Sequence, residues 1–398
     1  MRFLRKKVTL GVALSLMLIS AAVAVSAAVL VTWRQFSLTV ENFSERQAMY
    51  NKLGMVDKEV RGNFYGDIDN EKLLDSLAEA YVASLDDRFS DYMTADEYEK
   101  QSLYSDGKSV GIGVTVEATQ DGLIRVVSVD KGAPASAAGV LEGDIVIAVA
   151  GKSVAEAGYE KSVESMLGKA GTVCAFTVRR GGETKDFSIK REEFESLSVE
   201  SRRVGTVGYV KIEGFHNNTD EQFEKAVDQL VEDGAKGLIF DVRGNGGGTL
   251  DSVAHMIDLL VPKGDIVSVT SKNGRTEVMY KSDEKEIDLP MVVLVDGDTA
   301  SASELFAAAL RDYKKATVIG TQTYGKGVMQ RTYELDDGSA VRVTVGLFNP
   351  PSGKNFNNKG VKPDVEVKLT EEQMANFDQL TDETDPQIQA ALAALLDV

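Results

Sequence analysis

The chain has 398 residues, with 62 acidic and 44 basic side chains and a formal net charge of −18. This negative charge argues against nucleic acid as a partner, because the phosphate backbone is bound mainly through Lys and Arg. The single cysteine, Cys174, excludes an internal disulfide and lies in an alternating, strand-like stretch where a buried apolar role is expected.

The N-terminus has the features of a membrane anchor. Residues 1–7 carry four positive charges, and residues 8–33 contain no charged side chain. A membrane-spanning helix needs about 20 apolar residues. The sequence therefore predicts a single-pass anchor at 8–33, with 1–7 as its cytoplasmic flank and the rest of the chain outside the cytoplasm. A cleaved signal peptide, which would give a secreted form, stays open because Ala22-Val23-Ala24 resembles a cleavage site.

Residues 36–101 show mostly helical spacing of apolar side chains. The residues expected on one helix face are Leu73, Leu74, Leu77, Ala80, Tyr81 and Leu85. This segment is interpreted as a small helical cap or a dimer arm.

Short strands dominate residues 102–190. Strands are expected at 110–116, 123–129 and 144–149, with two short helices and a final strand pair joined at Arg180-Gly181-Gly182. This order resembles a PDZ domain, a fold that binds an extended chain end as an added strand and captures its carboxylate with backbone amides. The candidate carboxylate loop is Val110-Gly111-Ile112-Gly113, and a plain β-turn is the alternative.

Strands and helices alternate in residues 199–367. A strand at 207–212, a helix at 219–231 and apolar, buried-type strands at 237–242 and 291–295 predict an α/β core. Residues 368–398 are acidic and rich in Ala and Leu, which indicates a helical tail.

Ser301 follows one of these buried strands, at the point where a helix is expected to begin. A serine at such a turn presents its hydroxyl outside the sheet. The next amide, that of Ala302, is then one of the unpaired N–H groups that favour an oxyanion. The alternative is that a hydroxyl of this segment only caps the helix.

A glycine run at 244–248 follows another buried strand, and Gly246 or Gly247 could supply a second oxyanion donor. A plain turn is the alternative. A dinucleotide loop fits poorly, because the run lacks the G-x-G-x-x-G pattern.

Lys326 stands 25 positions after Ser301, between two glycines. A serine needs a base, yet His216 lies in a polar loop and His255 in an apolar helical run, neither in a motif suited to orient it. A lysine can serve if burial lowers its pKa from about 10.4. The amide of Gln330 could orient that amine.

A nucleotide site at this lysine is disfavoured. Residues 320–326 match G-x-x-x-x-G-K, but Gly327 stands where a phosphate loop has Ser or Thr. The sequence also has no metal-ligand cluster of the H-E-x-x-H type, so no metal or other cofactor is expected.

The combined motifs, with a PDZ-like region before them, resemble the C-terminal processing peptidases (tail-specific proteases) from Asp69 to Val367. The motifs are Asp-Val-Arg-Gly-Asn-Gly-Gly-Gly from Asp241, Thr-Ala-Ser-Ala-Ser-Glu from Thr299 and Thr-Tyr-Gly-Lys-Gly-Val-Met-Gln from Thr323.

The resemblance implies a serine endopeptidase on a crotonase-like α/β core with an inserted PDZ domain. It implies Ser301 as nucleophile, Lys326 as general base and Gln330 as the residue that orients the base. One departure is Leu167-Gly168, where relatives often have an arginine before the glycine.

The resulting hypothesis is a membrane-anchored protease whose PDZ domain selects exposed C-termini of exported proteins and whose Ser301 forms an acyl-enzyme. A non-catalytic PDZ scaffold for envelope proteins and an acyl-CoA enzyme are the alternatives. A homodimer built from the N-terminal helices and the C-terminal tail is compatible with the resemblance. The substrate, the cleavage preference and whether the PDZ domain activates or only tethers are left open.

Overall fold

The structure is a computed structural model that describes residues 9–39 and 43–396. The chain divides into two compact units, one up to Ser76 and one from Leu77 onward. The predicted cytoplasmic flank, residues 1–7, lies outside the described residues.

The N-terminal unit is helical. It contains α1 (Leu10–Thr39) and α2 (Phe43–Asn63), and α3 (Asn70–Ala83) crosses the boundary between the units. Within α1, Leu10–Val29 is the only stretch of the described chain that is long and apolar enough to cross a membrane, a test that signal sequences also pass.

The PDZ region is a sheet with strand order β3-β4-β5-β7-β8, and β6 pairs with β5. Its elements are β3 (Val114–Ala118), β4 (Ile124–Val129), α5 (Pro134–Ala138), β5 (Ile145–Val149), β6 (Lys152–Ser153), α6 (Val154–Ala157), α7 (Tyr159–Met166), β7 (Val173–Arg180) and β8 (Glu183–Lys190). Cys174 is buried in its core, as expected. A separate ribbon of β2 (Lys108–Gly111) and β9 (Glu192–Glu195) connects this region to the rest of the chain.

The α/β core is built on a second sheet, with order β10-β11-β12-β15-β16-β19. Its strands are β10 (Val199–Val204), β11 (Val207–Ile212), β12 (Leu238–Asp241), β15 (Met291–Val295), β16 (Ala316–Gly320) and β19 (Val365–Glu366). Only the β10–β11 pair is antiparallel. Both faces are covered, which explains why β15 is apolar along its whole length and β12 is apolar up to its last residue, Asp241.

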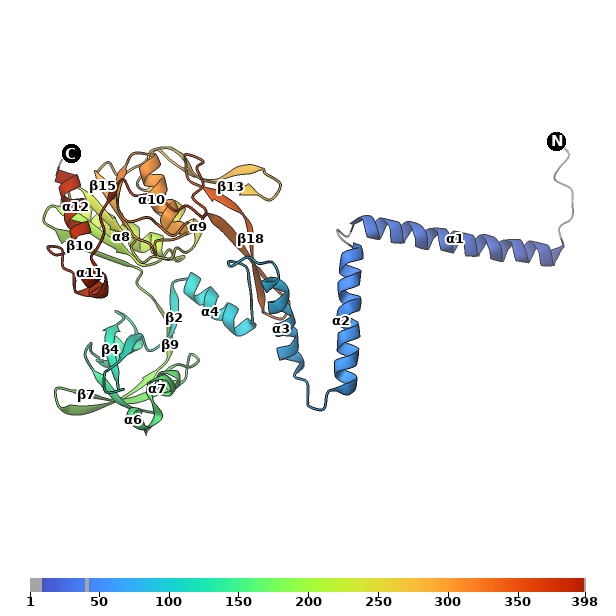
Figure 1. Ribbon diagram of the computed structural model, residues 1–398, viewed down its shortest axis with the longest axis horizontal. Helices are drawn as coiled ribbons and strands as arrows, with labels where there is room; N and C mark the ends of the chain where they lie inside the picture. Colours follow the sequence, from blue (N-terminus) through green and yellow to red (C-terminus); the bar gives the residue numbers. More distant parts are fainter. Residues whose placement is uncertain (1–8, 40–42, 397–398) are drawn as a thin grey trace. The chain divides into compact units, whose positions relative to one another are not determined.

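Helices occupy the two faces of this sheet. Residues of α8 (Thr219–Glu232), α9 (Leu250–Asp258) and α10 (Ala302–Asp312) join one face in a single core cluster. Helix α12 (Pro386–Leu396) lies on the other face (Figure 1). Its Ile388 and Ala391 pack there against the sheet. The C-terminal tail also contains α11 (Glu371–Ala375) and a 3₁₀ turn, Phe377–Gln379.

An antiparallel sheet of β1, β18, β13 and β14, with β17 also paired to β18, completes the core. Its strands are β1 (Asp91–Met93), β13 (Gly264–Ser271), β14 (Thr276–Ser282), β17 (Val328–Glu334) and β18 (Ala340–Asn349). Strand β1 and helix α4 (Ala95–Ser105) lie in the segment expected to be mostly helical. The prediction missed β1 because a three-residue strand shows no periodicity, and its pairing partner is about 250 residues away.

Candidate active site

Ser301 occupies a strained turn between β15 and α10. Its backbone has φ 57° and ψ −116°, an unusual conformation for a residue with a side chain. Such a conformation costs about 1–3 kcal/mol and persists only where the surroundings impose it. It is a conformation often found at functional sites.

Ser301, Lys326 and Gln330 line one cavity of about 360 Å³. Gly246 and Ala302 line it as well. The other lining residues include the apolar Phe215, Leu250, Val328, Met329 and Phe348 and the polar Gln101, Tyr104, Ser105, His216, Thr249, Thr332 and Arg342. Ser301, Lys326 and the two residues expected to supply oxyanion amides therefore line one partly apolar space.

The pKa of Lys326 is lowered from its ordinary value. Burial is the largest cause, and the positive charges of Arg342 and Arg88 add to it, opposed by Asp87 and Asp91. The amine lies 4.7 Å from the ring centre of Phe89, and no ion pair holds it within the described residues. The surroundings thus make this amine easier to deprotonate than a free lysine, which is the direction that a general base requires.

Glu304 joins the serine and lysine segments, a role that sequence reasoning missed. Its side chain is completely buried and accepts hydrogen bonds from the amides of Ser301 at 2.9 Å, Lys326 at 2.7 Å and Gly325 at 2.8 Å. It also accepts one from the Thr323 hydroxyl. The signal was present, since Glu stands three residues after Ser301, the spacing of a capping box.

Gln330 lies in the pocket but does not hold the lysine in this structure. Its amide nitrogen donates to Val328 O at 3.3 Å and to Thr344 Oγ1 at 3.2 Å. Its carbonyl oxygen accepts no hydrogen bond from the part of the chain that is described. Over the same residues, no hydrogen bond joins the Ser301 hydroxyl to the Lys326 amine.

The glycine loop packs directly on the serine turn. A Cβ added to Gly247, whose φ is +110°, would lie 2.9 Å from both Ser301 Cβ and Ala300 O. The Gly247 amide donates to Asn245 Oδ1 at 2.8 Å, whereas Gly246 lines the cavity. Of the two predicted glycines, Gly246 is the one that faces the pocket in this conformation.

His216 lines the same cavity, although sequence reasoning set it aside. Its ring packs edge-to-face on Tyr104 at 4.6 Å between ring centres, and burial lowers its pKa. It makes no hydrogen bond to Ser301 within the described chain. His255 is exposed and pairs with Asp220 instead.

The predicted carboxylate loop spans the end of β2 and the two residues before β3. Val110 and Gly111 belong to β2, whereas Ile112 is buried in the PDZ core. The carbonyls of Ile112 and Gly113 accept from Ala135 N and Asp130 N, while their own amides have no acceptor among the described residues. The adjacent strand, β3, stands at the edge of its sheet.

Comparison with known proteins gives the family. The profile of peptidase family S41 matches residues 206–367, and that of the PDZ domain matches 110–190. A probable CtpA-like serine protease of Staphylococcus aureus is 37% identical over 333 residues, 83% of this chain and 67% of the relative. The carboxy-terminal processing protease CtpA of Bacillus subtilis is 35% identical over 357 residues, 89% of this chain and 76% of that one.

A solved structure, a putative S41 protease from Bacteroides fragilis, matches with a TM-score of 0.54 at 18% identity. The match covers 84% of this chain and 98% of that one and shows the fold alone. The resemblance inferred from the motifs is confirmed by the relatives. The chain is a serine-type peptidase with a PDZ domain, and it belongs to the C-terminal processing peptidases of family S41.

Proposed function

We propose that the protein is a membrane-anchored endopeptidase that recognises C-terminal tails through its PDZ domain and cleaves them with Ser301, Lys326 and Gln330. The observation that carries this proposal is the single cavity lined by all three side chains. The lowered pKa of Lys326 supports its part as the base.

In the proposed reaction, Ser301 Oγ attacks a peptide carbonyl while Lys326 Nζ takes the hydroxyl proton. The oxyanion is bound by the amide of Ala302 and by a glycine amide of the loop, Gly246 or Gly247. Lys326 then returns the proton to the leaving amine, and water releases the acyl-enzyme. The carbonyl oxygen of Gln330, which has no donor among the described residues, accepts from the lysine amine and directs it.

The PDZ proposal is supported by the edge position of β3 and by the loop before it. A substrate chain end can add as a strand to β3, because an edge strand has backbone groups without a partner strand. The amides of Ile112 and Gly113 would then bind the terminal carboxylate.

The membrane proposal is supported by Leu10–Val29, a stretch of mean hydropathy 2.4. The peptidase part would lie outside the cytoplasm. Extraction of the protein by detergent but not by alkaline carbonate is expected. A mature N-terminus downstream of Ala24 would contradict the anchor and favour a cleaved signal peptide.

The direct test of the catalytic proposal uses three full-length variants, with a fluorophore-labelled unfolded casein as substrate and a fluorophosphonate as serine probe. Ser301→Ala should abolish hydrolysis and labelling, and Lys326→Ala should abolish hydrolysis. His216→Gln should keep hydrolysis, because His216 makes no hydrogen bond to Ser301 in the described structure. Hydrolysis by Lys326→Ala at neutral pH, with loss in His216→Gln, would assign the base to the histidine.

A homodimer is also proposed, through apolar side chains of α3. Leu74, Leu77 and Tyr81 of this helix are exposed. Sedimentation of the detergent-solubilised chain at the monomer mass would contradict it.

A further inference from the structure

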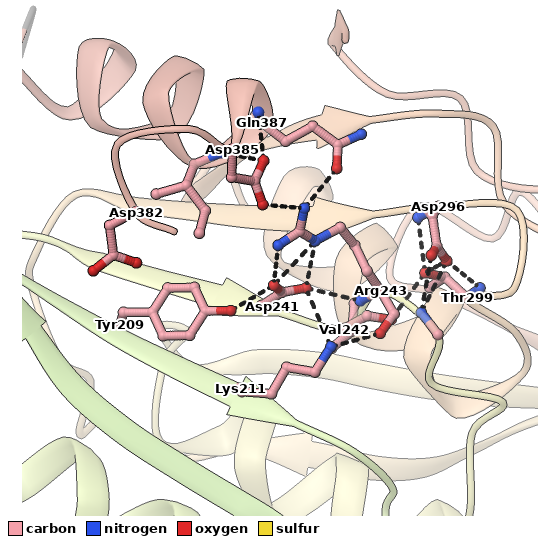
Figure 2. A network of polar contacts seen from close by, with 12 residues as sticks. Tyr209, Lys211, Asp241, Val242, Arg243, Asp296, Thr299, Asp382, Asp385 and Gln387 are labelled. Atoms are coloured by element: carbon pink, nitrogen blue, oxygen red, sulfur yellow. Dashed lines mark hydrogen bonds and ion pairs between the residues drawn. The ribbon is translucent and has the colours of Figure 1, made fainter. Parts of the chain in front are cut away.

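The C-terminal tail contributes two side chains to a buried polar network beside the glycine loop (Figure 2). Arg243 Nη1 donates to Asp385 Oδ2 and to Gln387 Oε1, each at 2.8 Å. Arg243 is 4% exposed, and Asp385 and Gln387 are each 2% exposed. These contacts join residues more than 140 positions apart in the sequence.

The other side of the guanidinium binds Asp241, at the end of β12. Arg243 Nε lies 2.9 and 3.0 Å from the two carboxylate oxygens of Asp241, and the Arg243 amide donates to Oδ1 at 3.0 Å. Asp241 also accepts from the Tyr209 hydroxyl at 2.6 Å and lies 3.9 Å from Lys211 Nζ. The carboxylates of Asp241 and Asp385 therefore balance the positive charges of Arg243 and Lys211. Removal of either carboxylate would leave a positive charge without its counterpart.

The residues that follow Asp241 are hydrogen-bonded to the turn that contains Ser301, the proposed nucleophile. Val242 O accepts from Thr299 Oγ1 at 2.9 Å, as Figure 2 shows. Asn245 O accepts from Ala300 N at 3.0 Å and from Ser303 Oγ at 2.9 Å. A displacement of Arg243 would therefore strain the hydrogen bonds that set the position of the loop relative to Ser301.

We propose that Asp385 and Gln387 are positioning residues of the peptidase, which hold Arg243 so that the oxyanion glycines keep their place beside Ser301. The tail is then part of the catalytic apparatus, although none of its described residues lines the cavity. This inference rests on the proposed Ser301 site and its glycine donors.

One substitution of Asp385 can separate its contact with Arg243 from its capping of helix α12. Asp385 Oδ1 accepts from the amides of Gln387 and Ile388 at the start of that helix, whereas Oδ2 binds Arg243. Asn caps helices as well as Asp does. In Asp385→Asn, the amide oxygen can keep the cap while the NH₂ group faces Arg243, donor against donor.

The experiment measures casein hydrolysis and the rate of fluorophosphonate labelling for the full-length chain in detergent. For Asp385→Asn we expect kcat to fall about tenfold or more with KM within about twofold, and labelling to slow by the same factor. Cooperative melting should persist, and Asp385→Glu should recover part of kcat. Gln387→Met removes the acceptor of Arg243 and also the Nε2 donor to Val367 O at 2.7 Å, without a change of charge, and should show a smaller loss of the same kind.

Asp382→Asn is the matched control, because Asp382 lies in the same tail and pairs with Arg202 rather than Arg243. It should keep wild-type kcat. Wild-type kcat and labelling in folded Asp385→Asn, or in Gln387→Met if the former does not fold, would overturn the proposal, as would an equal loss in Asp382→Asn. Ser301→Ala runs in parallel: activity in that variant would instead overturn the proposed function.

Discussion

Replacement of Glu304 by Gln tests how the serine and lysine segments are held together. Oε1 of Glu304 accepts from Thr323 Oγ1 and Gly325 N, and Oε2 accepts from Ser301 N and Lys326 N. A glutamine has one acceptor oxygen in place of two. Whichever way its amide turns, its NH₂ group faces at least one backbone N–H that previously had an acceptor.

The less costly orientation keeps the oxygen on Ser301 and Lys326, because the Thr323 hydroxyl can turn and accept from the new NH₂ group. The Gly325 amide then loses its partner. An unpaired buried donor costs about 1–3 kcal/mol, and each hydrogen bond to a charged group is worth about 1.5–3 kcal/mol. We therefore expect a loss of about 3 kcal/mol in the free energy of unfolding. If displacement of the Lys326 segment raises the activation free energy by the same amount, kcat falls about a hundredfold.

Urea denaturation and steady-state casein hydrolysis measure the two quantities. The control is Leu230→Ala on α8, a buried leucine that does not line the cavity. It should cost about 2–5 kcal/mol of stability while the folded enzyme keeps its kcat. Wild-type kcat in Glu304→Gln, or an equal loss of kcat in Leu230→Ala, would refute the reasoning.

Three further outcomes are expected. Lys326→Met should abolish hydrolysis yet raise the melting temperature at neutral pH. At pH values between the lowered pKa of Lys326 in the folded state and its ordinary value of 10.5, the unfolded state binds more protons than the folded state. The stability of the wild type therefore rises with pH over this range, and the stability advantage of Lys326→Met should shrink. Arg88→Gln should move the acid limb of kcat/KM to higher pH and Asp87→Asn to lower pH, because the two charges act on Lys326 with opposite sign; shifts in the same direction would contradict this. Gly247→Ala should lose about a hundredfold or more in kcat, since the new Cβ meets Ser301. Gly244→Ala, which is also at positive φ but has nothing within 4 Å, should lose much less, and equal losses would point to backbone strain alone.

Ser301, Lys326 and the glycine loop could be proposed as site residues from the sequence, because each has a local sequence pattern that indicates its position in the fold. Ser301 follows an apolar strand, Lys326 stands between glycines, and the glycine loop follows β12. Parallel strands bring such ends to one edge of a sheet, so local patterns already predict which residues approach one another.

The contacts that hold these residues could not be predicted in the same way. The Arg243–Asp385 pair joins distant segments without any periodic signal. Glu304 shows the spacing of a helix cap, but that spacing does not name Gly325 or Lys326 as further partners. His216 lay in a polar loop, and only the tertiary fold brings it to the cavity.

Strand β1 makes the peptidase domain discontinuous in sequence. Phe89 lies against the lysine amine, and Asp91 pairs with Arg342 of β18, yet both precede the PDZ region. A shortened protein that starts after the PDZ region would keep the serine and the lysine but lose the wall that shields the amine from water. Such a fragment would hold Ser301, the proposed nucleophile, beside a solvated Lys326, so we expect the stretch ahead of the PDZ region to belong to the minimal enzyme.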